Sequence, residues 1–142
     1  MNKDAQLLKF VYQNSLMGVI TTNYILGAVD NRRLRREIKA QRSEYTRINR
    51  EAKCLLRKNG CKAWGVSPLQ KLCALAMIKL KTCWDNSPSH IAEMLILGSN
   101  MGIIDANKRL NQYKGAERDV RCLMHRLLRF EESNIQRLKQ FL

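Results

Sequence analysis

The chain has 142 residues, of which 45% are hydrophobic, so it is long enough to bury one core without disulfides or structural metals. Its 26 lysines and arginines against 12 aspartates and glutamates give a formal charge of +14, which attracts polyanions and anionic surfaces. Seven glycines and two prolines are too few for a fold of many short strands, and they predict an all-α protein.

The first predicted helix covers residues 4–26 and ends at Gly27, and the second is capped by Asp30 and ends at Asn59-Gly60. One face of the first helix gathers Leu7, Leu8, Val11, Ser15, Gly18 or Val19, and Thr22. The second has an apolar stripe whose spacing alternates between four and three, consisting of Leu34, Ile38, Gln41, Tyr45, Ile48, Ala52 and Leu55. Such regular stripes predict two amphipathic helices packed as a hairpin.

The side of the second helix opposite this stripe is strongly basic. Its candidate polyanion-binding residues are Arg32, Arg33, Arg36, Lys39, Arg50, Lys53 and Arg57. Such a face can neutralise phosphates in a salt-sensitive, sequence-independent way, or it can be a solvated helix surface. Few aromatic side chains accompany it, and no helix-turn-helix pattern is visible.

The second half of the chain repeats the hairpin pattern after a crossover at residues 61–86. Within the crossover, Ser67-Pro68 starts a short apolar helix that covers residues 69–84. Ser87-Pro88 starts a long helix that reaches Tyr113, and a last helix runs from Ala116 to the C-terminus. The inward residues of the last helix are Val120, Leu123, Leu127, Leu138 and Phe141. We therefore expect a single domain at 1–142, with hairpins at 4–60 and 87–142.

Residues 15–26 align without gaps to residues 99–110, and Ser, Met, Gly, Ile, Asn and Leu coincide. Gly18 matches Gly102, and a glycine inside a helix costs about 1 kcal/mol relative to alanine. A shared glycine therefore indicates a shared close approach of helices. Residues 44–48 loosely match residues 131–135 in the following helices. The chain is predicted to be two duplicated helical hairpins.

Two hairpins with this repeat, together with Ser89-His-Ile-Ala-Glu-Met94 and residues 98–105, resemble the ferritin-like superfamily, especially its small bacterial members without a complete di-metal site. The resemblance implies a four-helix bundle with a short extra helix in the crossover. Metal-loaded members use carboxylates and Glu-x-x-His pairs. Here Arg47 and Asn134 stand where the histidines would be, and Thr21 stands opposite Asp105. The remaining metal candidates are Glu44, Asp105 and Glu131, and no cofactor is expected.

The five cysteines, Cys54, Cys61, Cys73, Cys83 and Cys122, contain no Cys-x-x-Cys pair and disfavour a disulfide framework. No signal peptide is visible, and the most apolar run, residues 91–104, is shorter than the roughly 20 residues that cross a bilayer. We therefore expect a cytoplasmic protein with reduced thiols and no transmembrane segment.

No phosphate-binding loop or nucleophile motif occurs, and Cys122 and His125 share a helix face without an orienting carboxylate. No catalytic residue is therefore assigned. The leading hypothesis is a non-catalytic basic bundle that acts through protein contacts, with a protein partner or with itself. One alternative is binding of nucleic acid or another polyanion through residues 32–58. The other is a ferritin-like protein with a degenerate di-metal site.

Overall fold

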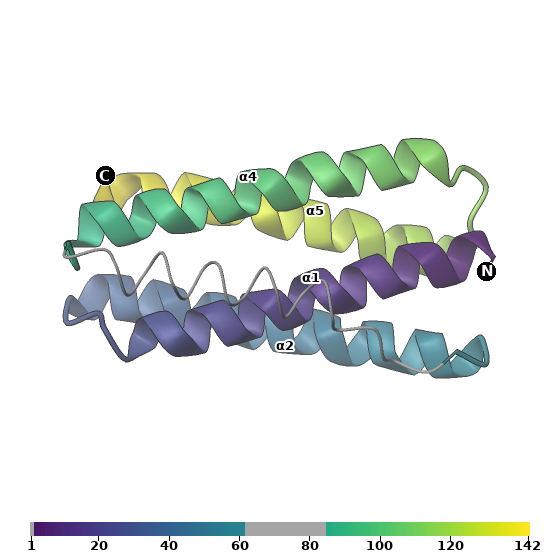
Figure 1. Ribbon diagram of the computed structural model, residues 1–142, viewed down its shortest axis with the longest axis horizontal. Helices are drawn as coiled ribbons and strands as arrows, with labels where there is room; N and C mark the ends of the chain where they lie inside the picture. Colours follow the sequence, from purple (N-terminus) through teal and green to yellow (C-terminus); the bar gives the residue numbers. More distant parts are fainter. Residues whose placement is uncertain (1, 62–84) are drawn as a thin grey trace.

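The computed structural model describes residues 2–61 and 85–142, and these residues form helices and no strand. Four long helices pack together side by side in an elongated bundle (Figure 1). They are α1 (Lys3–Leu26), α2 (Arg32–Lys58), α4 (Pro88–Gln112) and α5 (Arg118–Leu138), followed by the short 3-10 helix η1 (Lys139–Phe141). The all-α prediction is confirmed for this part of the chain. The short crossover helix predicted at residues 69–84 lies outside the described residues.

The helices form two antiparallel hairpins, α1 with α2 and α4 with α5 (Figure 1). Helices α2 and α4 run in the same direction, so α4 begins at the end of the bundle opposite to the end where α2 stops (Figure 1). Helix bundles with one long crossover connection have this arrangement, whereas up-down-up-down bundles need only short loops.

The helix ends follow local capping chemistry. The predicted C-terminal end of α2 and the predicted start of α4 are confirmed, since Gly60 adopts a positive φ of 70° and the Ser87 side chain caps the proline-started helix α4. The prediction that Asp30 caps α2 was wrong. The cap is the next residue, Asn31, whose side chain accepts a 2.9 Å hydrogen bond from the Leu34 N–H.

Helix α5 begins two residues later than predicted. Its N-cap is Glu117, and Ala116 lies outside the helix and is buried against the core. The Glu117 N–H donates a 2.9 Å hydrogen bond to Asp4 Oδ1. The first turn of α1 therefore binds a backbone donor at the start of α5, which fixes one end of the two hairpins relative to each other.

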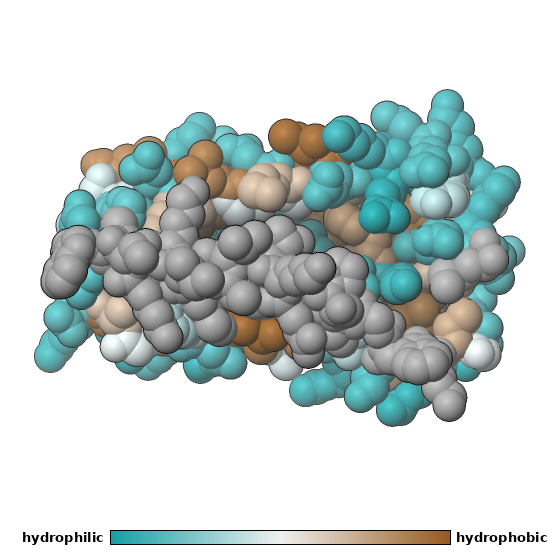
Figure 2. Space-filling view, in the orientation of Figure 1, coloured by the Kyte–Doolittle hydropathy of each residue, from teal (hydrophilic) through white to brown (hydrophobic). Residues whose placement is uncertain are grey.

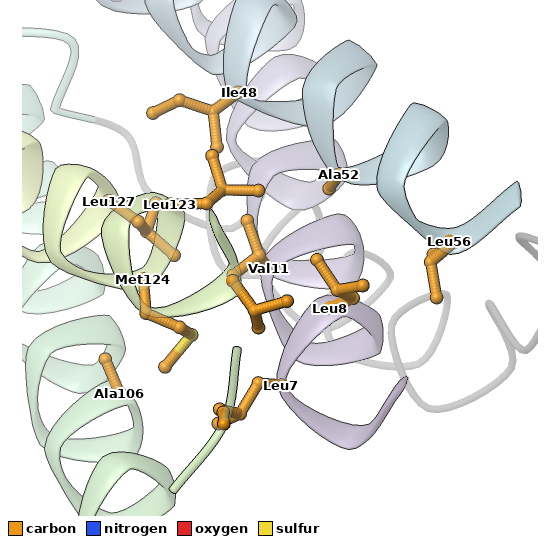
Figure 3. Packing of buried hydrophobic residues seen from close by; sticks show 12 residues of the cluster. Leu7, Leu8, Val11, Ile48, Ala52, Leu56, Ala106, Leu123, Met124 and Leu127 are labelled. Atoms are coloured by element: carbon orange, nitrogen blue, oxygen red, sulfur yellow. The ribbon is translucent and has the colours of Figure 1, made fainter. Parts of the chain in front are cut away.

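The core divides into two apolar clusters, one towards each end of the bundle. The larger cluster brings together all four helices, as Figure 3 shows for Val11 of α1, Ile48 of α2, Ala106 of α4 and Leu127 of α5. The smaller cluster contains Ile25, Leu26, Val29, Leu34, Ile38, Ile91, Ala92 and Leu138. The inward residues predicted for α1 and for the last helix are buried, except that Gly18, Val19 and Phe141 are only half-buried, and Phe141 lies in η1.

The stripe of α2 is confirmed from Leu34 to Ala52, with one shift at its end. Leu56 is buried there, whereas the predicted Leu55 is half-buried. Gln41 and Tyr45 are buried polar residues of this stripe, and Ser15 and Thr22 are buried polar residues of α1. The two α1 hydroxyls each donate to a carbonyl one turn earlier in the same helix, at 2.7 Å, so these groups are hydrogen-bonded inside the bundle.

Candidate functional site

Helix α2 directs its acidic residues to one flank. Glu37, Glu44 and Glu51 are spaced seven residues apart, and all three form ion pairs with arginines of α5. Arg126 lies between two of them, 2.8 Å from Glu44 Oε1 and 2.6 Å from Glu51 Oε2. Glu44 also pairs with Arg47 at 2.9 Å. The negative charge of α2 is therefore concentrated at the border between α2 and α5.

These arginines determine the charge state of Glu44. Its partial burial raises the pKa, but the hydrogen bonds and the positive charges of Arg126 and Arg47 outweigh burial and lower the pKa of the carboxyl below its ordinary value. Glu44 is consequently an anion neutralised by two cations at neutral pH.

The other flank of α2 binds α1. Arg35 Nη1 donates to the backbone oxygens of Leu26 and Val29, where it compensates the negative end of the α1 dipole. Further along, Arg42 donates to Asn23 Oδ1 at 2.9 Å, and Asn49 Nδ2 donates to the Tyr12 oxygen at 3.0 Å. The polar residues on both flanks of α2 thus serve the packing of the hairpins.

The outward face of α2 holds the basic residues predicted from the sequence, and the structure places all seven on the surface. They are Arg32, Arg33, Arg36, Lys39, Arg50, Lys53 and Arg57, here called the α2 basic face. Arg33 donates to Gln140 Oε1 at 2.7 Å and lies over the Phe141 ring. Within the described residues, no carboxylate pairs with any of the seven. Their charge is therefore not neutralised by the part of the bundle that the structure describes.

A buried polar cluster lies between the two apolar clusters. The Tyr45 hydroxyl donates a 2.6 Å hydrogen bond to Glu131 Oε1, and Glu131 is only 2% exposed. The Tyr45 ring lies against Gly18 of α1, where an added Cβ would stand 2.4 Å from the ring. Phe130 contacts the same ring edge-on, with centroids 4.7 Å apart. Gly18 is therefore the residue that lets the tyrosine reach into the bundle.

Burial raises the pKa of Glu131 to about 7, although the nearby Ser99 and Tyr45 hydroxyls favour its charged form. Burial also raises the pKa of Tyr45 well above its ordinary value, and the adjacent carboxylate acts in the same direction. Near neutral pH the pair therefore consists of a protonated phenol and a carboxyl group that is about half protonated.

Four buried atoms around this pair have no hydrogen-bond partner among the described residues. They are Asn14 Nδ2, Glu131 Oε2 and both amide atoms of Asn134. Next to them is a cavity of about 140 Å³, lined by Asn14, Met17, Gly18, Thr21, Thr22, Ile25, Gln41, Tyr45, Met94, Leu95, Gly98, Ser99 and Glu131. A pocket with convergent polar groups and a shifted pKa is the usual form of a ligand site.

The metal candidates do not share one site. Glu131 is buried with Tyr45, Glu44 is bound by two arginines at the α2–α5 border, and Asp105 is exposed on α4. Within residues 2–61 and 85–142, no three histidine, cysteine, aspartate or glutamate side chains gather as metal ligands would. The arginines beside Glu44 would repel a cation. The donor set therefore does not fit a di-metal centre.

Helix α4 carries a row of exposed apolar residues on the surface, here called the α4 row. Leu97, Met101 and Ile104 are 53%, 58% and 54% exposed, and they lie three or four residues apart on one side of the helix. Figure 2 shows apolar surface along the edge that α4 forms, beside mostly hydrophilic surroundings. Among the described residues, no helix is both long and apolar enough to cross a membrane.

Asn14, Ser99 and Asn134 belong to the polar cluster and were not predicted from the sequence. For Glu131 and Asn134 the signal was present, because they continue the inward stripe of α5 at spacings of three and four between Leu127 and Leu138. The seven-residue spacing of the α2 glutamates was a similar signal for the α2–α5 border. By contrast, nothing local indicates that Tyr45 and Glu131 meet across 86 positions.

Comparisons with protein-family models, with curated proteins and with solved structures found no match to the chain.

Proposed function

We propose that the protein is a non-catalytic binding protein that contacts the phosphate backbone of nucleic acid through the α2 basic face. The observation that carries the proposal is the separation of charge on α2. Its glutamates are paired with α5, whereas the lysines and arginines of the α2 basic face have no carboxylate partner within the described residues. Such a surface releases counterions from a polyanion when it binds.

The length of the face suits an extended polyanion. Helix α2 has 27 residues, which span about 40 Å at the usual rise of an α-helix. Duplex DNA presents about one negative charge per 1.7 Å of its axis, so several phosphates lie within reach along that length. The face has no exposed aromatic residue to stack on unpaired bases, which favours contact with the phosphates of a duplex.

Charge reversal tests the proposal against a matched control. Changing Arg36, Lys39, Arg50 and Lys53 to Glu should lower the affinity for a labelled DNA duplex more than 100-fold while helicity by circular dichroism is unchanged. The control reverses four exposed residues after α4, namely Arg118, Arg121, Arg129 and Lys139. Each set lowers the +14 charge by eight, since every reversal replaces one positive charge with one negative charge. Equal losses of affinity for the two variants would contradict a specific role of α2.

Protein contact is the second candidate, and the α4 row favours it. The partner we propose is a second copy of this chain. Helix α4 contains two acidic and two basic residues, Glu93, Asp105, Lys108 and Arg109, so copies meeting there avoid the repulsion between strongly basic surfaces. Sedimentation velocity should show concentration-dependent dimers that Met101→Lys abolishes. A monomer at all concentrations would rule out this second candidate.

The ferritin-like resemblance and its duplicated hairpins remain part of the proposal. Support comes from the matched residues Ser15 and Ser99, which are both buried, and from the matched glycines. Gly18 faces Tyr45 of α2, whereas Gly102 lies nearest to Asn14 of α1 and then to Glu131 of α5. A cytoplasmic location is proposed on the free thiols of Cys54, Cys61 and Cys122. Cys73 and Cys83 lie outside the described residues.

A further inference from the structure

The cavity beside the polar cluster has one polar end and one apolar end. Asn14, Tyr45, Ser99 and Glu131 form the polar end, and the apolar lining includes Met17, Ile25, Met94 and Leu95. Helices α1 and α4 supply most of the lining, and Gly98 of α4 is an exposed part of it. The lining therefore connects the buried carboxyl group with the surface between these two helices.

The polar end offers one donor and one acceptor that the protein leaves unused. Asn14 Nδ2 and Glu131 Oε2 are buried without a hydrogen-bond partner among the described residues. Both side chains lie within 4 Å of the point where a Cβ on Gly102 would stand, so they are close to each other. Because unpaired buried polar atoms are costly, a group that donates to one and accepts from the other would be bound favourably.

The volume sets the size of the ligand. A cavity of about 150 Å³ lined by apolar side chains is known to hold benzene, and this one measures about 140 Å³. A single water molecule would complete the polar end but would leave the apolar walls without contacts. The remaining space fits a small ring or a short hydrocarbon chain.

Charge excludes ionised ligands. The Glu131 carboxyl opposes an anion at the polar end. It would attract a cation, but this group is only about half ionised near pH 7 and the +14 charge of the chain opposes the approach. Transfer of any ion into this buried position would also cost much of its hydration free energy. A hydroxyl group avoids these costs and supplies one donor and one acceptor.

We infer that the cavity between α1 and α4 binds an uncharged molecule of about six to eight non-hydrogen atoms, with an apolar body and one hydroxyl group that bridges Asn14 and Glu131. This inference goes beyond the proposed function, since the α2 basic face does not line the cavity and either site can fail without the other.

A series of four probes of similar size tests the inference on the unmodified protein: benzyl alcohol, toluene, benzylamine and benzoate. Isothermal titration should show one saturable site for benzyl alcohol, with affinity about tenfold higher than for toluene because of the hydroxyl hydrogen bonds. The two charged probes should bind more weakly than benzyl alcohol. Equal affinity for toluene and benzyl alcohol, stronger binding of a charged probe, or no saturable binding at all would overturn the inference.

Methionine methyl resonances locate the bound probe. Met17 and Met94 line the cavity, whereas Met101 is exposed and Met124 is buried in the larger apolar cluster. With methionine-methyl labelling, benzyl alcohol should shift the signals of the first two and leave the other two unchanged. Shifts confined to Met101 would place the probe on the α4 row and overturn the assignment.

Asn14→Leu tests the polar end, with Asn111→Leu as the control at an exposed position of α4. The first variant should lower the affinity for benzyl alcohol to that for toluene, and the control should leave both affinities unchanged. Thr21→Leu adds bulk at a position that lines the cavity, and it should weaken the binding of both benzyl alcohol and toluene. Circular dichroism of each variant separates loss of binding from loss of fold. A folded Asn14→Leu protein that still prefers benzyl alcohol would contradict the proposed bridge.

Discussion

The Tyr45 hydroxyl donates a 2.6 Å hydrogen bond to Glu131 Oε1, joining the second helix of one hairpin to the second helix of the other. Both residues are buried, and Gly18 makes room for the tyrosine ring. This pair is the polar centre of the bundle and lies between its two apolar clusters.

Removal of the phenol hydroxyl should destabilise the fold. Tyr45→Phe removes the hydrogen bond that the phenol donates to Glu131 Oε1 inside the bundle, and such a loss costs about 1–3 kcal/mol. Urea denaturation followed by circular dichroism measures this change in the free energy of unfolding. Tyr12→Phe, at a half-buried position, should change it by less than about 0.5 kcal/mol. Equal effects of the two substitutions would mean that the Tyr45 hydrogen bond does not stabilise the bundle.

Two glycine substitutions should have opposite signs. Gly18→Ala would place a Cβ 2.4 Å from the Tyr45 ring, and overpacking of this kind costs about 1–3 kcal/mol. A Cβ at Gly98 meets nothing within 4 Å, so Gly98→Ala should stabilise helix α4 by about 0.5–1 kcal/mol. Thermal unfolding of the two variants provides the comparison. A neutral Gly18→Ala protein would show that the ring can move aside without loss.

Stability should fall as the pH rises through the range in which Glu131 ionises. Its pKa is about 7 in the folded protein and 4.5 in the reference state, so the folded state binds more protons between these values. At or below pH 4.5 the buried carboxyl group is protonated and does not destabilise the fold. Above pH 7 it is ionised, and the full loss of stability from burying the carboxylate is reached. The full effect is about 3 kcal/mol. Glu131→Gln should remove this dependence, so the difference between the two unfolding free energies should change with pH. Parallel curves from pH 4 to 8 would contradict the prediction.

The positions of α1, α2 and α5 were predictable because each buries a regular stripe, and the start of α4 was predictable because Ser87-Pro88 is a capping signal. The stripe of α2 includes Gln41 and Tyr45, and their apolar neighbours were sufficient to place them inward. The burial of Glu131 was harder to predict, since an acidic side chain in a helix is usually solvated and its partner Tyr45 is distant in the sequence. The cavity depends on the relative rotation of four helices, which no local pattern determines. The α2 basic face could be predicted from the sequence because its position depends only on the periodicity of one helix.

Arg126 should contribute little to stability despite its two ion pairs. Its side chain is 38% exposed, and Glu51 is 47% exposed, so solvent screens much of the attraction. Arg126→Ala should lower the free energy of unfolding by about 1 kcal/mol or less at low salt, and by less at 1 M salt. Arg129→Ala, at an exposed position of the same helix without an ion pair among the described residues, is the control. A large, salt-independent loss would indicate that Arg126 acts through packing.

The salt dependence of nucleic-acid binding tests the central claim most directly. A labelled DNA duplex is titrated with the protein at several salt concentrations, and the logarithm of the association constant is plotted against the logarithm of salt concentration. Contacts from four to seven residues of the α2 basic face predict a slope of about −4 to −6, with binding still measurable at physiological salt. Reversing Arg36, Lys39, Arg50 and Lys53 to Glu should make the slope shallower by about 4 units. Binding that disappears well below physiological salt, or a slope unchanged by the reversal, would contradict the account.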